Sequence, residues 1–364
     1  MSGSRRIEGI DVARGVASLI MIQGHAYDGW VAPAHKESAA YLFTRLLGSL
    51  PLPAFLVLAG AAIVLRVDAA RRKGESADVV RRAVMRRGLG VVLWGYAANA
   101  AYALMDGWDG VETFLRADVL HVIGLSIVAF AFLGIRGASA PERAPLLRAA
   151  LALALVPTVI CPWVSDLPIE GPARFVLGLL VDVPGVTLMP FVPLASWLAV
   201  GALTCLAMLR ARARSSAPPS RAGAPTRALL VIAAVGLAAA WTGAWATGAM
   251  VEALGGTLSR AHPAVWANAV DLAGRGVFVL AVAALGSLVL PARARAALIR
   301  LGRGSLVAYV FHIPFCYGRL GAPVRGRLDM LTATGLVLAL MVVSWLAVWA
   351  RDRMRAQSPS VASS

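Results

Sequence analysis

Charged residues are scarce in this sequence. Asp, Glu, Lys and Arg make up only 15% of the 364 residues, whereas a typical soluble domain has about a quarter. Hydrophobic residues account for 59%, and the mean hydropathy is +0.73. These values exclude an ordinary soluble globular domain and indicate an integral membrane protein.

Lysine and cysteine are also rare, with 2 lysines beside 33 arginines and 3 cysteines. The net charge of +16 could suggest nucleic acid, but the basic residues occupy short loops between apolar segments. They form no soluble basic face, so we expect no nucleic-acid partner. Without a CxxC pair, a metal or redox site is not expected. A disulfide between Cys161 and Cys316 stays open, although lone apolar cysteines usually only pack.

Long apolar runs dominate what is present. A helix crosses the hydrocarbon core with about 20 apolar residues. Ten segments meet this requirement, some with polar interruptions: 10–30, 46–66, 84–105, 118–136, 146–164, 187–209, 228–250, 265–290, 304–320 and 330–350. We therefore predict an all-α integral membrane protein, a bundle of about ten transmembrane helices.

The loops between these segments predict the orientation. The N-terminus and alternate loops hold 25 of the 35 Lys and Arg residues, whereas the opposite loops hold 8. Basic loops stay in the cytoplasm. Both termini are therefore expected to be cytoplasmic, and the location is expected to be the bacterial inner membrane.

The chain is expected to form a single transmembrane domain over residues 1–355. A Pro/Ser/Arg-rich stretch, residues 210–227, has the composition of a cytoplasmic linker between the sixth and seventh helices. Residues 356–364 are expected to be a disordered tail.

Polar groups within the first predicted helix are candidates for function, because burying a charge in a membrane costs at least about 2.5 kcal/mol. Asp11, Arg14 and His25 share one helical face, and His25 lies roughly 16 Å outward of Arg14. Asp11 and Arg14 have the spacing of an ion pair, and Asp28 follows His25. The alternative is structural: a capped, anchored helix end and a histidine that only contacts neighbouring helices.

Three other segments carry similar candidates. His121 follows Asp118 at the start of an apolar run, where an N-cap beside an interfacial histidine is the structural alternative. Asp271 and Arg275 are four residues apart within an apolar run, and they form either a structural ion pair or a substrate-binding pair. His312 lies near mid-membrane, two residues before Pro314, which is expected to loosen the helix.

Several motifs resemble the transmembrane acyltransferases, which include the acyltransferase-3 proteins and the heparan-alpha-glucosaminide N-acetyltransferase-like proteins. In the first helix, IDVARGVA (10–17) precedes Gly24-His25-Ala26, and the Arg14–His25 spacing is typical of the acyltransferase-3 branch. The further motifs, which look most like bacterial relatives of the heparan branch, are PAFLVLAG (53–60), DVLHVIGLS (118–126) and LGRGSLVAYVFH (301–312).

The resemblance implies an acyltransferase that takes an acyl group, commonly acetyl, from cytoplasmic acyl-CoA. The acceptor would be a sugar or another envelope molecule on the periplasmic side. His25 would be catalytic with Asp28 orienting it, and Asp11 and Arg14 would bind the donor. The acceptor would be bound by four residues, His121, Asp271, Arg275 and His312. In the heparan branch the reactive histidine follows the first helix, so His35 stays an alternative to His25.

Two other classes stay open. A transporter or flippase of a small metabolite or lipid-linked sugar also uses charges at the membrane midplane. A non-catalytic membrane scaffold would tolerate replacement of the polar residues. The expected partners are the lipid bilayer, acyl-CoA and a glycan or other envelope acceptor, and a homodimer stays open. No metal is expected.

Overall fold

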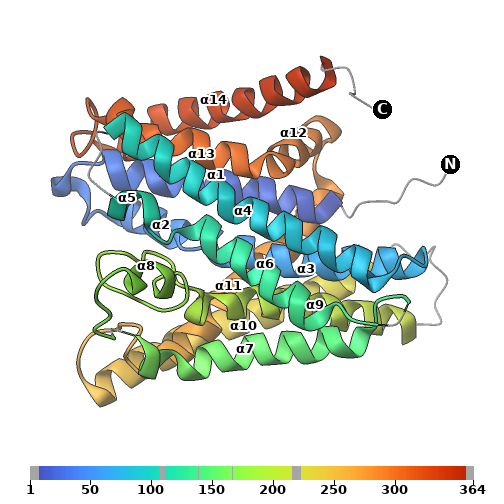
Figure 1. Cartoon of the computed structure of the whole chain (residues 1–364). Coiled ribbons are helices and arrows are strands. Elements are labelled where there is room, and N and C mark those ends of the chain that lie inside the picture. The colour runs from blue at the N-terminus through green and yellow to red at the C-terminus, as the bar shows by residue number, and fades with distance from the viewer. Residues whose placement is uncertain (1–7, 107–110, 138, 166, 215–222, 358–364) are drawn as a thin grey trace. The chain divides into compact units, whose positions relative to one another are not determined.

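The computed structural model describes residues 8–106, 111–137, 139–165, 167–214 and 223–357, and within them it shows helices and no strands. The chain divides into two compact units (Figure 1). The terminal unit is Met1–Pro51 with Gly286–Ser364, and the central unit is Leu52–Leu285. Parts of the predicted linker and tail, residues 215–222 and 358–364, lie outside the described residues.

Every predicted apolar segment contains a helix, which confirms the all-α class. The helices are α1 (Glu8–Trp30), α2 (Ala39–Gly48), α3 (Pro51–Arg72), α4 (Ala77–Asp106), α5 (Val111–Leu115), α6 (Val119–Gly134), α7 (Arg143–Val164), α8 (Ala173–Leu177), α9 (Phe191–Arg214), α10 (Gly223–Leu254), α11 (Val265–Val289), α12 (Ala292–Arg303), α13 (Ser305–Cys316) and α14 (Met330–Gln357), with short 3-10 turns η1 (Pro33–His35) and η2 (Arg319–Gly321).

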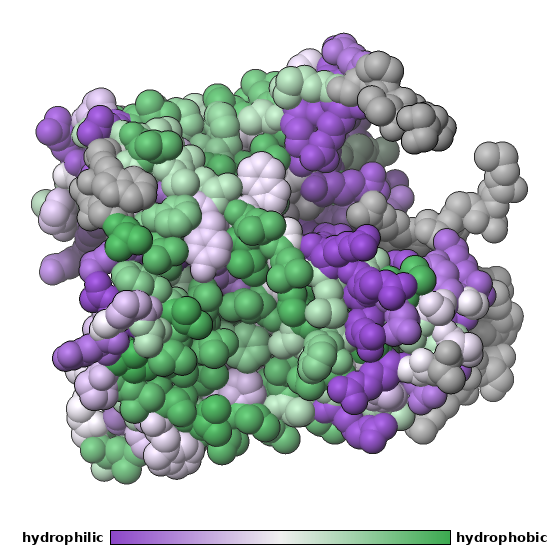
Figure 2. Space-filling view, in the orientation of Figure 1, coloured by the Kyte–Doolittle hydropathy of each residue, from purple (hydrophilic) through white to green (hydrophobic). Residues whose placement is uncertain are grey.

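Length and apolarity qualify seven helical stretches in the described residues as membrane spans, or eight if the bent pair α12–α13 is one span. The shorter apolar helix α6 and the more polar α1 are not among them. Large hydrophobic side chains such as Leu93, Trp241 and Trp245 are exposed, as expected for surfaces that face lipid. Figure 2 shows hydrophobic residues over the middle of the helices and hydrophilic residues toward their ends.

In the terminal unit, α1 runs parallel to α13 and antiparallel to α14, and the three helices lie alongside one another in Figure 1. The hydroxyls of Tyr27 and Thr334, which join α1 to α14, are 2.7 Å apart. Near the opposite end of α1, α12 packs so closely that the structure admits only glycine. A Cβ on Gly302 would lie 1.9 Å from the Asp11 carbonyl oxygen, and one on Gly15 would lie 2.3 Å from the Leu298 carbonyl oxygen.

The bend between α12 and α13 differs from the expectation. Residues 293–303, expected to be a loop, are helical, and the chain turns by 78° at Gly304. Pro314 lies inside α13 without breaking it, so the prediction of a helix break there was wrong. The turn is anchored by apolar packing, because Leu301 and Ala308 on its two sides are buried against Val348 of α14.

In the central unit, α4 packs on α6, and α9 packs on α6 and α7. Helices α10 and α11 approach closely, since a Cβ on Gly243 would lie 2.3 Å from the Asp271 nitrogen. The longer helices of the central unit therefore pack against one another, whereas the short helices α5 and α8 bury no residue. This packing positions His121 on α6 and the Asp271–Arg275 pair on α11.

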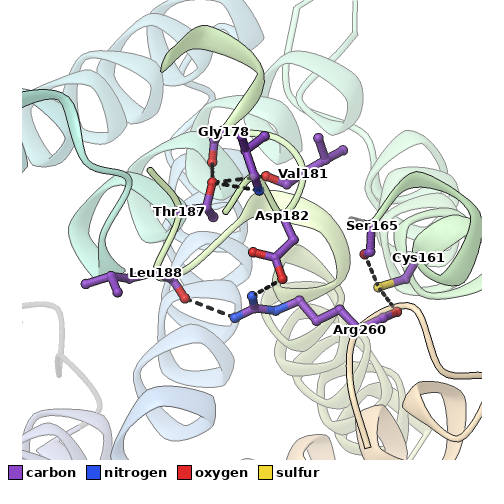
Figure 3. A network of polar contacts seen from close by, with 9 residues as sticks. Cys161, Ser165, Gly178, Val181, Asp182, Thr187, Leu188 and Arg260 are labelled. Atoms are coloured by element: carbon purple, nitrogen blue, oxygen red, sulfur yellow. Dashed lines mark hydrogen bonds and ion pairs between the residues drawn. The ribbon is translucent and has the colours of Figure 1, made fainter. Parts of the chain in front are cut away.

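Arg260, in the loop after α10, connects this loop to the segment that follows α7 in the central unit (Figure 3). Its guanidinium donates to the Asp182 carboxylate at 2.5 Å and to the Leu188 carbonyl at 2.9 Å. Its own carbonyl accepts from the Cys161 thiol at 3.4 Å, and the Thr187 hydroxyl donates to the Gly178 carbonyl at 2.8 Å. All three cysteines lie in the described residues as buried thiols and form no disulfide.

The close approach of α1 and α12 predicts opposite effects of alanine at two helical glycines. Gly302→Ala should lower the melting temperature of the detergent-solubilised protein, because overpacking against the α1 backbone costs about 1–3 kcal/mol. Gly335→Ala is the matched control: Gly335 lies exposed on α14 with nothing within 4 Å of the added Cβ. The control should leave the melting temperature unchanged or raise it. Equal shifts in the two variants would contradict the packing described.

Candidate functional site

Two candidates, Asp11 and Arg14, lie near the start of α1, where α12 packs against it. Asp11 is buried, and its carboxylate accepts from the Arg303 Nε at 3.0 Å. One turn earlier on α1, Glu8 is 3.8 Å from Arg295 of α12. The sequence suggested Arg14 as a partner of Asp11, and the structure adds Arg303 of α12 as a partner from a distant part of the chain. Arg14 lies beside them, one turn along α1 and half-buried.

At the other end of α1, His25 pairs with His312 of α13. His25 Nδ1 is 2.8 Å from His312 Nε2, and the two rings lie nearly parallel, at 14°. His312 is fully buried, and its Nδ1 is 2.8 Å from the carbonyl oxygen of Ala308, one helical turn earlier. The parallel course of α1 and α13 brings these histidines together, although 287 residues separate them along the chain.

Asp28 lies beside this pair, within a set of donors. Its carboxylate accepts from Arg45 at 3.0 Å, from Tyr317 at 2.9 Å and from Tyr41 at 3.4 Å. The Tyr317 ring packs against His25, with centroids 5.5 Å apart. Tyr317 follows α13, and desolvation by the surrounding protein, together with the Asp28 carboxylate, raises the pKa of its phenol. Tyr317 is therefore a hydrogen-bond donor at neutral pH and connects Asp28 to the His25 ring.

His35 occupies a different environment. It is exposed in η1, and the Ser38 hydroxyl donates to its backbone carbonyl at 2.7 Å. The neighbouring Lys36 donates to the Asp28 carbonyl at 2.8 Å, which ties this turn to the end of α1. The imidazole of His35 is thus solvated, whereas that of His25 is partly buried against other side chains.

His121 lies in the central unit, in the capping box of α6. Asp118 is the N-cap residue, and its carboxylate accepts from the Val119 nitrogen at 2.6 Å. His121 Nδ1 in turn accepts from the Asp118 nitrogen at 3.1 Å, and its buried ring meets Tyr96 edge-on at 4.3 Å. The Asp118 cap that the sequence suggested is confirmed, and it explains the position of His121 without a substrate.

Asp271 and Arg275 form the predicted pair on α11, within the central unit. The guanidinium binds the carboxylate through two bonds, of 2.6 and 2.7 Å. Asp271 is buried, so this fork–fork pairing compensates for the burial of the carboxylate. A second buried carboxylate of the same unit, Asp68, accepts from Arg143 at 2.8 Å and also pairs with Arg72.

The structure therefore brings five of the eight candidates into the terminal unit: Asp11, Arg14, His25, Asp28 and His312. The other three, His121, Asp271 and Arg275, belong to the central unit. Sequence reasoning missed the pairing of His25 with His312 and of Asp11 with Arg303, which no local spacing reveals. The detectable signal was the basic stretch 292–303, which overlaps the start of the motif 301–312 that contains His312. Within the described residues, no group of three or more His, Cys, Asp or Glu side chains could hold a metal ion.

The fold and these sites define the class: an all-helical, multi-pass membrane protein in which a histidine of its first helix contacts a histidine of α13. A family model for the catalytic region of heparan-alpha-glucosaminide N-acetyltransferase matches residues 6–239, well over half of the chain. The chain belongs to this family, as its motifs predicted, and membership implies an N-acetyltransferase activity. No individual curated protein matches the chain. The matched residues include His25 and end before His312.

Proposed function

We propose that this protein transfers an acetyl group from cytoplasmic acetyl-CoA to an amino or hydroxyl group of a glycan or other envelope acceptor on the periplasmic side. The observation that carries the proposal is the position of His25. It lies on α1, the helix that also holds Asp11 and Arg14, and it contacts His312 of α13. From Asp11 to His25, α1 rises roughly 20 Å. That distance is comparable to the extended pantetheine arm of CoA, which would carry the thioester from one end of α1 to the other.

His25 acts as the general base of the reaction. It takes a proton from the acceptor as the acceptor nitrogen or oxygen bonds to the acetyl carbon. When the carbon–sulfur bond breaks, His25 returns the proton to the CoA sulfur. The alternative is nucleophilic catalysis, in which His25 carries the acetyl group itself before the acceptor takes it. Asp28 acts through Tyr317, whose ring packs against His25.

Positive charge at the start of α1 supports the binding of the donor there. Arg14 faces the CoA phosphates, and α12 adds Arg293, Arg295, Arg300 and Arg303 at the same end of α1. The Asp11 carboxylate fixes Arg303, which orients one of these guanidinium groups. Arginine suits this role, because its planar fork binds phosphate oxygens in pairs. The roles of His121, Asp271 and Arg275 in acceptor binding stay predictions.

Removing the catalytic imidazole tests this function. Purified His25→Ala protein in liposomes, given acetyl-CoA and glucosamine as a probe acceptor, should transfer acetyl at least about 100-fold more slowly, because it lacks the base. His35→Ala is the matched control and should keep the wild-type rate within about twofold. Mass spectrometry of the acetylated sugar gives the measurement.

Two results would contradict this function. If His25→Ala retained the normal rate while His35→Ala lost it, the reactive histidine would be His35. If the wild-type protein moved a sugar across the liposome membrane without CoA and acetylated nothing, the transporter class would replace the acetyltransferase.

We propose the orientation on the same grounds of charge: about ten spans in the bacterial inner membrane, with both termini cytoplasmic. The arginines of α12 and those in the last turn of α3 then lie inside, whereas η1 and the loop that holds Arg260 lie outside. This arrangement sets the donor end of α1 toward the cytoplasm and His25 toward the periplasm. A single domain over residues 1–355, bounded by lipid, is the simplest unit consistent with it, and a homodimer stays open.

Cysteine labelling tests the orientation, because the three native cysteines are buried. Ala34 in η1 and Lys73 after α3 are both exposed. In spheroplasts, a membrane-impermeant maleimide should label Ala34→Cys and leave Lys73→Cys unlabelled until the cells are lysed. Labelling of Lys73→Cys alone in intact spheroplasts would reverse the proposed orientation.

A further inference from the structure

We infer that His312 is a positioning residue that holds neutral His25 in its Nδ1–H tautomer, so that the lone pair lies on Nε2. This inference rests on the proposed function for its catalytic meaning, but the tautomer itself can be observed without any reaction. It assigns to His312 a different role from the acceptor binding expected from the sequence.

The first step concerns the proton of His312. Its Nδ1 is 2.8 Å from the Ala308 carbonyl oxygen, which only accepts hydrogen bonds. His312 Nδ1 must therefore carry a hydrogen and donate it. In a neutral imidazole one nitrogen donates and the other accepts, so His312 Nε2 carries the lone pair.

The second step concerns the hydrogen between His312 and His25. The 2.8 Å contact between His25 Nδ1 and His312 Nε2 needs one hydrogen between the two nitrogens. Because His312 Nε2 is the acceptor, the hydrogen belongs to His25 Nδ1. The lone pair of neutral His25 then lies on Nε2, the nitrogen on the other side of the ring.

The alternative is a charged His312 that donates from both nitrogens. His312 is fully buried, and its two ring contacts are the imidazole of His25 and the Ala308 carbonyl. The nearby Asp28 carboxylate is occupied by Arg45, Tyr41 and Tyr317. A buried cation without a carboxylate partner is costly, so the neutral form of His312 is favoured.

The contacts of the His312 ring fix its position for this role. Its ring is bonded at Nδ1 to its own helix and meets Tyr309 edge-on, with centroids 6.0 Å apart. Helix α1 is held against α13 nearby, since the Trp30 indole donates to the Phe315 carbonyl at 2.8 Å. An imidazole fixed in this way orients the base and its tautomer, as a carboxylate does in many other histidine sites.

Nitrogen NMR of the full-length protein, labelled with ¹⁵N-histidine in detergent micelles at neutral pH, tests the inference. The chain has only five histidines, and a His25→Gln sample identifies the signals of His25. We expect a protonated-type shift for His25 Nδ1 and an unprotonated-type shift for Nε2. Free neutral histidine favours the opposite tautomer, so the expected pattern requires the His312 contact.

Variants at His312 separate positioning from packing. His312→Phe keeps the ring volume but removes the acceptor, so His25 should revert to the Nε2–H tautomer. Acetyl transfer should fall at least about tenfold, because the lone pair is then on the wrong nitrogen. His312→Gln keeps an acceptor oxygen near the Nε2 position. It should therefore keep part of the Nδ1–H tautomer of His25 and part of the acetyl-transfer rate. His35→Gln is the control and should leave the His25 shifts unchanged.

Three outcomes would overturn the inference: an unprotonated Nδ1 on wild-type His25, an unchanged His25 tautomer in a folded His312→Phe protein, or equal losses in the Phe and Gln variants. Elution on size exclusion and helix content by circular dichroism establish folding. If the wild-type tautomer is as expected but the protein acetylates no acceptor, the proposed function fails and the positioning of His25 stands.

Discussion

The cost of burying an unpaired polar group in a membrane protein is the constraint on which this structure depends. Charged residues are few. The buried carboxylates offset the cost of burial by pairing with arginine: Asp11 with Arg303, Asp271 with Arg275, and Asp68 with Arg143. The first pair joins α1 to α12, the last joins α3 to α7, and the Asp271–Arg275 pair lies within α11. His25 and His312 of the terminal unit differ from these ion pairs, because each places a ring nitrogen 2.8 Å from a ring nitrogen of the other.

The sequence predicted the helices well, because a run of about 20 apolar residues has few other folds. It predicted the Asp271–Arg275 pair and the Asp118 cap equally well, since both are local in the chain. It failed where contacts are distant. Nothing in the spacing of α1 indicates that Arg303, 292 residues away, binds Asp11. The turn at Gly304 was missed because proline is the stronger known helix breaker, while packing against α14 decides the bend.

The functional conclusion combines two independent sources. Family membership over residues 6–239 implies acetyl transfer and includes His25. The geometry adds a second histidine beyond the matched residues and shows how it contacts the first. Together they support the proposal that the start of α1, beside the arginines of α12, binds the CoA phosphates and that the end with His25 and His312 serves proton transfer. The neutral form of an imidazole is the one that can take a proton from an acceptor.

The central claim is that α1 joins a donor end to a reactive end. The most direct measurement is an experimental structure of the protein with a non-reactive acetyl-CoA analogue, in which a methylene replaces the thioester sulfur. The account predicts phosphates beside Arg14 and the arginines of α12, and the acetyl carbonyl in contact with His25 Nε2. An analogue whose acetyl group lies away from His25, or whose phosphates bind at the opposite end of α1, would contradict it.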